Sequence, residues 1–261
     1  MITSAHNPKI RYLQKLEKRA YRKREKRMRI EGVRLLEEAL DAGVSFAFVL
    51  TCAELEAGDR APALRERLMQ EGVTLLETTP PLLREAAGTV NPQGFVAAVE
   101  LPALPAPENP SLILVLDNVR DPGNVGTMLR TAAAAGLDLA LVTPGSADPF
   151  APKVMRAAMG AQFRLPIRRE PASALAFMHG PGDTPLHIRA AAADGDIVYT
   201  DADWTLPSAI LIGGEAQGLS QESEALSPQR LRIPMPGRME SLNAAAAAAV
   251  MVFEALRQRR G

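Results

Sequence analysis

A chain of 261 residues with 47% hydrophobic residues is long enough for one large or two ordinary domains, each with a buried core. Its 30 basic and 30 acidic side chains balance, which argues against binding nucleic acid over the whole surface, and no apolar run reaches the about 18 residues that cross a membrane. A single cysteine excludes an intramolecular disulfide and a multi-cysteine zinc site, and three dispersed histidines do not suggest a metal site.

The chain starts without an apolar signal segment, so we expect a cytoplasmic protein. Residues 9–34 then carry a dense run of Lys and Arg, with Ile10, Leu13 and Leu16 at helical spacing. A helix with a thin apolar stripe and a basic surface is suited to following phosphates, although a solvated charged helix is the plain alternative. The residues expected to bind nucleic-acid phosphates are Arg11, Lys15, Arg22, Lys23, Lys26 and Arg27.

Helices and strands alternate from there to residue 101. The pattern predicts helices at 34–43, 61–72 and 80–88, and strands at 45–51, 73–78 and 94–101. This alternation predicts a small α/β domain over residues 1–101 with a mostly parallel or mixed sheet. Residues 102–110 contain four prolines, which predicts a stiff linker and places a second domain at 111–261.

The second domain opens with an apolar run at 111–119, which is typical of a parallel strand buried on both faces. The alternation continues with strands at 137–143, 163–167, 186–190 and 209–214 and helices at 127–136, 152–160 and 172–179. This pattern alone predicts an α/β fold with a doubly wound sheet, in which ligands bind beyond the carboxyl ends of the strands. The loops expected at that edge are 117–126, 143–146, 213–219 and 234–243.

The last predicted helix has no polar side over Ala244–Phe253, so we expect it to be buried all round. Pro234, Pro236 and Gly237 predict a loop before it, and Ser241 is the expected N-cap. Taken alone, these residues also fit an alanine-rich core helix without any chemical role.

Several polar residues fall in the loops at the expected ligand edge. Asn124 could orient a bound group, Arg130 lies on an otherwise apolar helix, and Gly213 and Gly214 before Glu215 let the backbone approach a ligand. Each has a plain alternative, namely an ordinary turn, a salt bridge or a snorkelling surface arginine. The GxGxxG and Walker fingerprints, a Ser-His-Asp triad and a paired-carboxylate site are absent, so neither a common nucleotide fold nor hydrolysis is supported.

Three segments, in this order, resemble the motifs of the SpoU/TrmH branch of the SPOUT RNA methyltransferases. They are NVRDPGNVGTMLRTAAAAG, ILIGGEAQGLS and IPMPGRMESLNAAAAAAVMVFEALRQ. The N-terminal part, with ITSxxNPxI, EGxRLLEEAL and VNPQGFVAAV, resembles the substrate-binding domain that many of these enzymes carry. The resemblance covers nearly the whole chain. One departure is Ala244-Ala245, where the family commonly has Val-Ser.

The resemblance implies an S-adenosylmethionine-dependent RNA ribose 2′-O-methyltransferase without a metal. It also implies a trefoil knot in the C-terminal α/β domain, in place of the ordinary doubly wound sheet, and a homodimer held through that domain with cofactor sites at the interface. The implied catalytic residues are Arg130, Asn124, Glu215, Ser241 and Asn243. The implied cofactor-binding residues are Thr143, Gly213, Ile233, Met235 and Leu242.

By analogy of the N-terminal domain, 23S ribosomal RNA is favoured as the substrate over transfer RNA. The alternatives are a tRNA 2′-O-methyltransferase and a non-catalytic RNA-binding or ribosome-assembly protein of the same fold. A silent relative could lose Asn124, Arg130, Glu215 and Asn243 freely, and their presence favours an enzyme. A guanidinium has a pKa above about 12, so we expect Arg130 to orient the 2′-hydroxyl, with a role as base held open.

Overall fold

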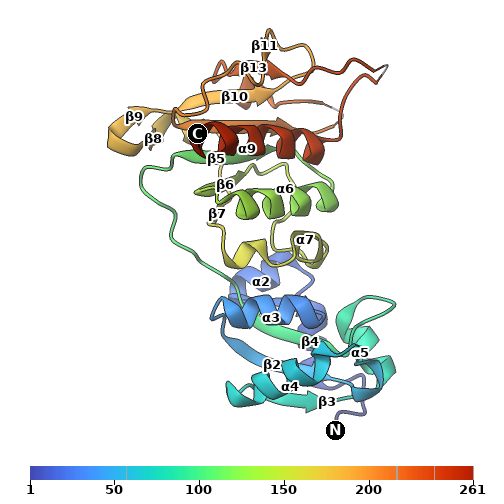
Figure 1. Cartoon of the computed structure of the whole chain (residues 1–261). Helices are drawn as coiled ribbons and strands as arrows, with labels where there is room; N and C mark the ends of the chain where they lie inside the picture. Colours follow the sequence, from blue (N-terminus) through green and yellow to red (C-terminus); the bar gives the residue numbers. More distant parts are fainter. Residues whose placement is uncertain (57, 216, 238, 261) are drawn as a thin grey trace. The chain divides into compact units, whose positions relative to one another are not determined.

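The computed structural model describes residues 1–56, 58–215, 217–237 and 239–260, which divide into two units (Figure 1). Unit 1 comprises Met1–Pro102 and Phe150–Phe163, and unit 2 comprises Ala103–Pro149 and the residues from Arg164 onward. Phe150–Phe163 thus groups with unit 1, although it follows the proline-rich segment in sequence. Among the described residues, no helix combines the length and the apolar character needed to cross a bilayer. The cytoplasmic location stays a prediction.

Unit 1 is a four-stranded mixed sheet with helices on both faces. Its strand order is β1-β4-β2-β3, with β4 antiparallel to β1 and β2, and β3 parallel to β2. Its elements are α1 (Pro8–Lys15), α2 (Arg19–Glu25), β1 (Arg27–Glu31), α3 (Val33–Asp41), β2 (Phe46–Thr51), α4 (Arg60–Gln70), β3 (Leu75–Glu77), α5 (Pro80–Ala87), β4 (Phe95–Glu100) and α7 (Pro152–Ala158), with short 3-10 turns η1 (Ala53–Leu55) and η2 (Ala161–Phe163).

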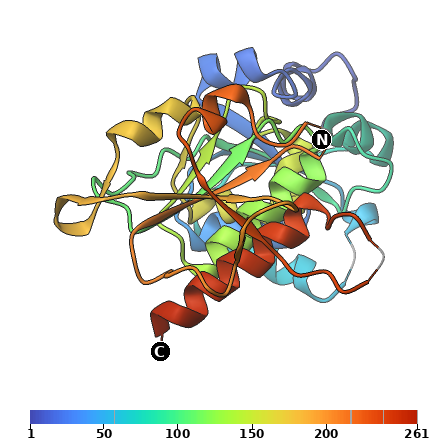
Figure 2. The same cartoon turned by 90° about the horizontal axis from the view of Figure 1, so that it is seen from above.

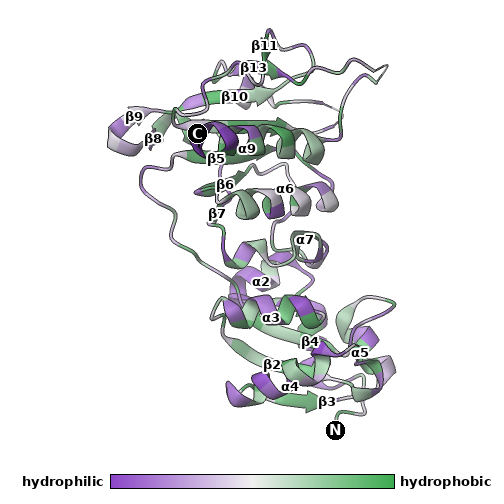
Figure 3. Ribbon diagram, in the orientation of Figure 1, coloured by the Kyte–Doolittle hydropathy of each residue, from purple (hydrophilic) through white to green (hydrophobic). Residues whose placement is uncertain are grey.

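Strand β4 lies between two hydrophobic clusters, which accounts for its run of apolar residues. Phe95, Ala97 and Val99 pack into a core cluster that includes residues of α3 and α4. Val96 and Ala98 point the other way, into a cluster with residues of α1 and α5. Both faces of the strand are therefore buried, and Figure 3 shows β4 in hydrophobic green.

The expectation of one long basic helix was wrong. Residues 9–34 form α1, α2, strand β1 and the start of α3. Helix α2 ends at Lys26, whose φ of 50° is left-handed, and Met28 and Ile30 then pair with β4 and are buried. The density of charge in this segment hides the short apolar alternation of a strand.

Unit 2 contains a seven-stranded parallel sheet with strand order β11-β13-β10-β12-β5-β6-β7, and the hairpin β8-β9. Its elements are β5 (Leu112–Asp117), α6 (Pro122–Ala135), β6 (Leu139–Val142), β7 (Ile167–Arg168), η3 (Ala172–Phe177), β8 (His179–Gly180), η4 (Pro181–Asp183), β9 (Thr184–Pro185), β10 (His187–Ala191), β11 (Ile197–Val198), β12 (Ser208–Gly213), α8 (Gln221–Glu224), β13 (Gln229–Arg232) and α9 (Ala244–Arg260). The trefoil knot itself stays a prediction.

Several expected elements of unit 2 are shifted or absent. The helix expected at 172–179 is the 3-10 segment η3, and the strand expected at 163–167 is only β7. The sequence pattern missed β8, β9, β11 and β13. In β13 only Leu231 is buried, and the arginines on either side of it donate to polar groups outside the core. The sequence of this strand therefore has the polar composition typical of a loop.

Helix α6 begins five residues earlier than expected. Asp121 is its N-cap and accepts a hydrogen bond from Asn124 N at 2.8 Å, while Pro122 occupies the first turn, where a missing N–H costs nothing. Asn124 therefore lies in the first turn of a helix and not in a loop. Its backbone direction is fixed by the cap.

Helix α9 differs from expectation in its cap and its burial. Asn243, and not Ser241, is the N-cap, because its Oδ1 accepts from Ala245 N at 2.9 Å directly before the first helical residue. One side of the helix packs beside α6 (Figure 2). Phe253 is nevertheless 50% exposed, so the expectation of a helix buried all round is wrong for the single chain.

Candidate active site

The carboxyl ends of β5, β12 and β6 meet at one edge of the sheet in unit 2. Asp117 ends β5 opposite Gly213 of β12, is 1% exposed, and accepts a hydrogen bond from Ser220 N at 2.6 Å. Thr143 donates to Asp117 Oδ1 at 3.2 Å and accepts from Asn118 N at 3.0 Å. These buried contacts tie three loops together beneath the site.

Beyond this edge lies a pocket of about 590 Å³, within the range of small-molecule sites. Its apolar wall comes from β12, β13 and α9, and its polar groups lie at its two ends. The lining residues are Ala191, Ala192, Ala193, Asp194, Ile212, Gly213, Gly214, Glu215, Gln217, Gly218, Leu219, Glu224, Arg230, Leu231, Ile233, Met235, Ser241, Leu242, Asn243, Ala244, Ala247 and Met251.

The glycines at the end of β12 are required by close backbone approaches. A Cβ on Gly213 would lie 2.6 Å from the carbonyl oxygen of Gly218, and one on Gly214 would lie 2.5 Å from that of Asn118. No side chain fits at either position without moving the backbone. The end of β12 is therefore packed directly against the backbone of the two loops that flank it.

Three polar side chains from distant segments meet at one end of the pocket. Glu215 Oε1 accepts hydrogen bonds from Asn124 Nδ2 at 2.6 Å and from Asn243 Nδ2 at 2.9 Å. Asn243 Nδ2 also lies 3.1 Å from Asn124 Oδ1. Because Asn243 caps α9 and Asn124 lies in the first turn of α6, both amides are held by helix ends, and they hold the carboxylate in turn.

The other residues expected to bind the cofactor or to act in catalysis fall in different places. Ile233, Met235, Leu242 and Ser241 line the pocket, as Gly213 does. Thr143 does not line it, because its hydroxyl is buried against Asp117 and the backbone of Asn118.

Arg130 lies away from the three polar residues. Six residues separate it from Asn124 on α6, which corresponds to about 9 Å along the axis and about 120° around it. Its side chain is exposed and does not line the pocket. It does not line the smaller hollow between residues 118–124 and 214–217 either. In the described part of the chain it has no hydrogen bond or ion pair. Within a single chain, the fold does not bring Arg130 to the Asn124–Glu215–Asn243 group.

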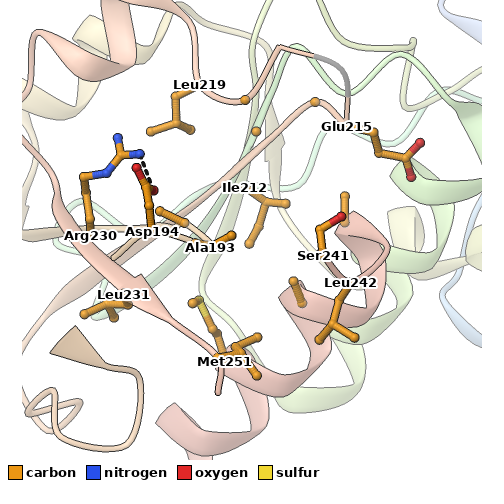
Figure 4. A pocket seen from close by; sticks show the side chains of 18 of the residues that line it. Ala193, Asp194, Ile212, Glu215, Leu219, Arg230, Leu231, Ser241, Leu242 and Met251 are labelled. Atoms are coloured by element: carbon orange, nitrogen blue, oxygen red, sulfur yellow. Dashed lines mark hydrogen bonds and ion pairs between the residues drawn. The ribbon is translucent and has the colours of Figure 1, made fainter. Parts of the chain in front are cut away.

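Sequence reasoning missed the charged group at the opposite end of the pocket (Figure 4). Arg230 pairs with Asp194 at 2.8 Å and with Glu224 at 2.9 Å. The hydrogen bond from Arg230 lowers the pKa of the Asp194 carboxyl, and the same bond raises the pKa of the Arg230 guanidinium. The sequence pattern predicted no helix, strand or binding motif at these three residues, so nothing in the sequence indicated that they would meet.

Of the basic residues expected to bind RNA, one is corrected by the structure. Arg22 is 3% exposed and donates to the backbone oxygens of Leu16 and Glu17 at 2.7 and 2.6 Å, so it closes the end of α1 and is not free for phosphate. The others lie on the surface of unit 1 and are Arg11, Lys15, Lys23, Lys26 and Arg27. Among the described residues no cluster of His, Cys, Asp or Glu could hold a metal ion.

Two domain families match the chain. Residues 111–253 match the SpoU rRNA Methylase family, and residues 7–97 match the MRM3-like substrate binding domain. The chain belongs to the SpoU rRNA methylase family. The resemblance seen in the sequence is thereby confirmed, and the fold of unit 2 is that of the SPOUT methyltransferases.

Three similar proteins align with this chain along nearly their whole length. An uncharacterized tRNA/rRNA methyltransferase of Synechocystis sp. is 34% identical over 99% of this chain and 94% of its own. A 23S rRNA (guanosine(2553)-2′-O)-methyltransferase of Bacillus subtilis is 30% identical over 97% of both chains. The SpoU methyltransferase AviRb of Streptomyces viridochromogenes, solved in complex with the cofactor AdoMet, superposes with a TM-score of 0.80 at 31% identity, covering 97% of this chain and 99% of its own.

Proposed function

We propose that this protein methylates the ribose 2′-oxygen of a nucleotide in 23S ribosomal RNA, with S-adenosylmethionine as the methyl donor. The observation that carries the proposal is the Asn124–Glu215–Asn243 group at one end of a pocket that has an apolar wall and charged groups at its other end. The names of the Bacillus and Streptomyces relatives support the reaction and the cofactor.

The pocket fits the cofactor chemically. It offers apolar side chains such as Ile212, Leu231 and Met251 for an adenine ring, and charged groups for a zwitterionic amino acid tail. When bound, S-adenosylmethionine would supply a methyl group on a sulfonium, which the ribose oxygen would take as the C–S bond breaks. The sulfur would keep the electron pair of that bond, and the hydroxyl proton would pass to water.

Glu215 is placed to position the hydroxyl. Both amide donors bind its Oε1, and within the described chain Oε2 has no hydrogen bond, so Oε2 can accept from a ribose hydroxyl. Holding the hydroxyl in line is the main contribution that fixed side chains can make here, because an oriented reactant avoids most of the entropic part of the barrier.

We further propose that two copies associate through unit 2. Helix α9 and the loop before it present Leu242 at 41% exposure, the exposed Ala246, the half-buried Val250 and Phe253 at 50% exposure. Ala246, Val250 and Phe253 are three and four residues apart, so they form one apolar stripe that a second copy can cover. A dimer also offers a way for Arg130 of one copy to reach the polar group of the other.

Phe253→Asp is expected to convert the dimer into a monomer, because it replaces the largest apolar side chain of the stripe with a charge. Light scattering at micromolar concentration measures the change. Phe177→Asp is the matched control: Phe177 is 87% exposed on η3, outside the stripe, and its replacement should leave the dimer intact. If both variants remain dimers, the interface lies elsewhere.

Replacing Lys23, Lys26 and Arg27 together by glutamine should weaken RNA binding and lower the salt slope of log K by about three units, one for each lost phosphate contact. All three are exposed, so the fold should survive. Filter binding over a salt series checks the result. An unchanged slope would mean that these residues form a solvated surface without contact to RNA.

The proposed function is tested by incubating unmodified 23S ribosomal RNA with the protein and labelled S-adenosylmethionine in chelator, followed by mass spectrometry of the nucleosides. A 2′-O-methylnucleoside is the expected product. Parallel reactions with transfer RNA decide between the two RNA classes. If calorimetry shows cofactor binding but neither RNA is methylated, a non-catalytic RNA-binding or ribosome-assembly protein would be favoured.

A further inference from the structure

A second hollow of about 270 Å³ adjoins the pocket and shares Gly214, Glu215 and Gln217 with it. Its remaining lining residues are Asn118, Val119, Arg120, Asp121 and Asn124. Glu215 therefore lies between two adjoining spaces, and Asn124, which lines the hollow, donates a hydrogen bond to it. A group in the hollow and a group in the pocket would meet at Glu215.

The segment that carries Arg120 is held rigidly. Asn118 has a left-handed φ of 54°, and its side chain occupies the space where Gly145 lacks a Cβ. The next backbone N–H, that of Val119, donates to Ser146 Oγ at 2.9 Å. Arg120 thus extends from a turn whose backbone is fixed on two sides.

Arg120 itself has no partner in the part of the chain that the structure describes. Its side chain is exposed at the hollow, without a hydrogen bond or an ion pair there. Three other arginines of unit 2 do have partners, although Arg130 has none among the described residues: Arg230 pairs with Asp194, and Arg232 and Arg259 donate to backbone oxygens. A guanidinium without a partner, beside a hollow and on a backbone that is held in place, is suited to binding an anion, and its planar fork matches phosphate.

We propose that this hollow receives the target ribonucleotide and that Arg120 binds its phosphate, which directs the ribose toward Asn124 and Glu215. This inference rests on the proposed function and adds a positioning residue to it. Arg120 does not reach the pocket, because only Gly214, Glu215 and Gln217 are common to both spaces. Its replacement should therefore affect RNA and leave the cofactor alone.

The kinetic test compares Arg120→Gln, Arg120→Lys and the control Arg260→Gln. Arg260 is an exposed arginine in the last turn of α9, about 24 Å along that helix from the polar group. Arg120→Gln should lower kcat/KM for 23S ribosomal RNA about 10- to 100-fold, the loss expected for a charge-assisted hydrogen bond, with cofactor affinity unchanged in calorimetry. Arg120→Lys should recover part of the loss, and Arg260→Gln should behave as wild type. Equal kcat/KM for wild type and Arg120→Gln would overturn the proposal.

A labelling test decides the point without turnover. Phenylglyoxal modifies accessible arginines, and mass spectrometry locates the modified residues. A 23S ribosomal RNA transcript should protect Arg120, whereas the corresponding free nucleosides, which lack phosphate, should not, and Arg260 should be labelled in both cases. Labelling of Arg120 that the transcript leaves unchanged would overturn its role even if the protein methylates RNA. Protection of Arg120 in a protein that methylates no RNA would support the phosphate site and reject the proposed reaction.

Discussion

Arg130→Ala is expected to lower the single-turnover rate of methyl transfer about 100- to 1,000-fold, the range seen when one charge-stabilising donor is removed from a site. Cofactor affinity should stay within about threefold of wild type, because Arg130 does not line the pocket. A loss of activity in this variant should not result from misfolding. Arg130 is exposed on α6 and has no partner among the described residues, and alanine is the strongest helix former, so stability should change by less than about 0.5 kcal/mol.

Arg130→Lys separates orientation from proton abstraction. Lysine keeps the charge but loses the planar fork, so an orienting role predicts partial activity with the pH dependence of the wild type. A base at this position predicts instead that the pH–rate profile moves to lower pH, because a lysine ammonium gives up its proton more readily than an arginine guanidinium. The rates are measured by rapid quench across pH 6 to about 10. If Arg130→Ala methylates at the wild-type rate, Arg130 has no part in the reaction.

The second large effect is expected at Asn243, because its side chain both caps helix α9 and belongs to the candidate active site. Oδ1 accepts from Ala245 N at 2.9 Å and caps α9, while Nδ2 donates to Glu215 Oε1 at 2.9 Å. Asn243→Ala removes both functions, with a loss of about 1 kcal/mol of stability for the cap. That variant alone cannot separate a folding defect from a chemical one.

Asn243→Asp separates them. The aspartate keeps a cap oxygen at a helix N-terminus, where negative charge is favourable and offsets part of the repulsion from the exposed Glu215, so the free energy of unfolding should fall by less than in Asn243→Ala. Methyl transfer should nevertheless fall about 100-fold or more, because a second carboxylate replaces the amide donor beside Glu215 and the like charges repel. Urea denaturation and single-turnover rates measure the two effects. A stable Asn243→Asp variant with wild-type turnover would remove Asn243 from the proposed site.

Features that depend on neighbouring residues were predictable from the sequence. The alternation of helices and strands, the glycines at the end of β12 and the loop before α9 are local demands of backbone geometry and burial. Resemblance to a known family then pointed to residues at the polar group, and the structure brings Asn124, Glu215 and Asn243 within hydrogen-bond distance. Local pattern failed where charge hid a strand, as in β1, and where a helix start depended on its cap.

Only the tertiary structure decided which of these residues meet. Asn124 and Glu215 are 91 residues apart, and Asn124 and Asn243 are 119 apart. They come together because β5 pairs with β12 near the centre of the sheet. This pairing is stabilised by the burial of both strands on both faces, which local propensity does not determine. The same long-range packing closed Thr143 beneath the site, left Arg130 outside it, and placed Asp194 with Arg230 in the pocket wall. Contacts between distant segments follow from the order of strands in the sheet, and that order is set by the packing of the whole domain.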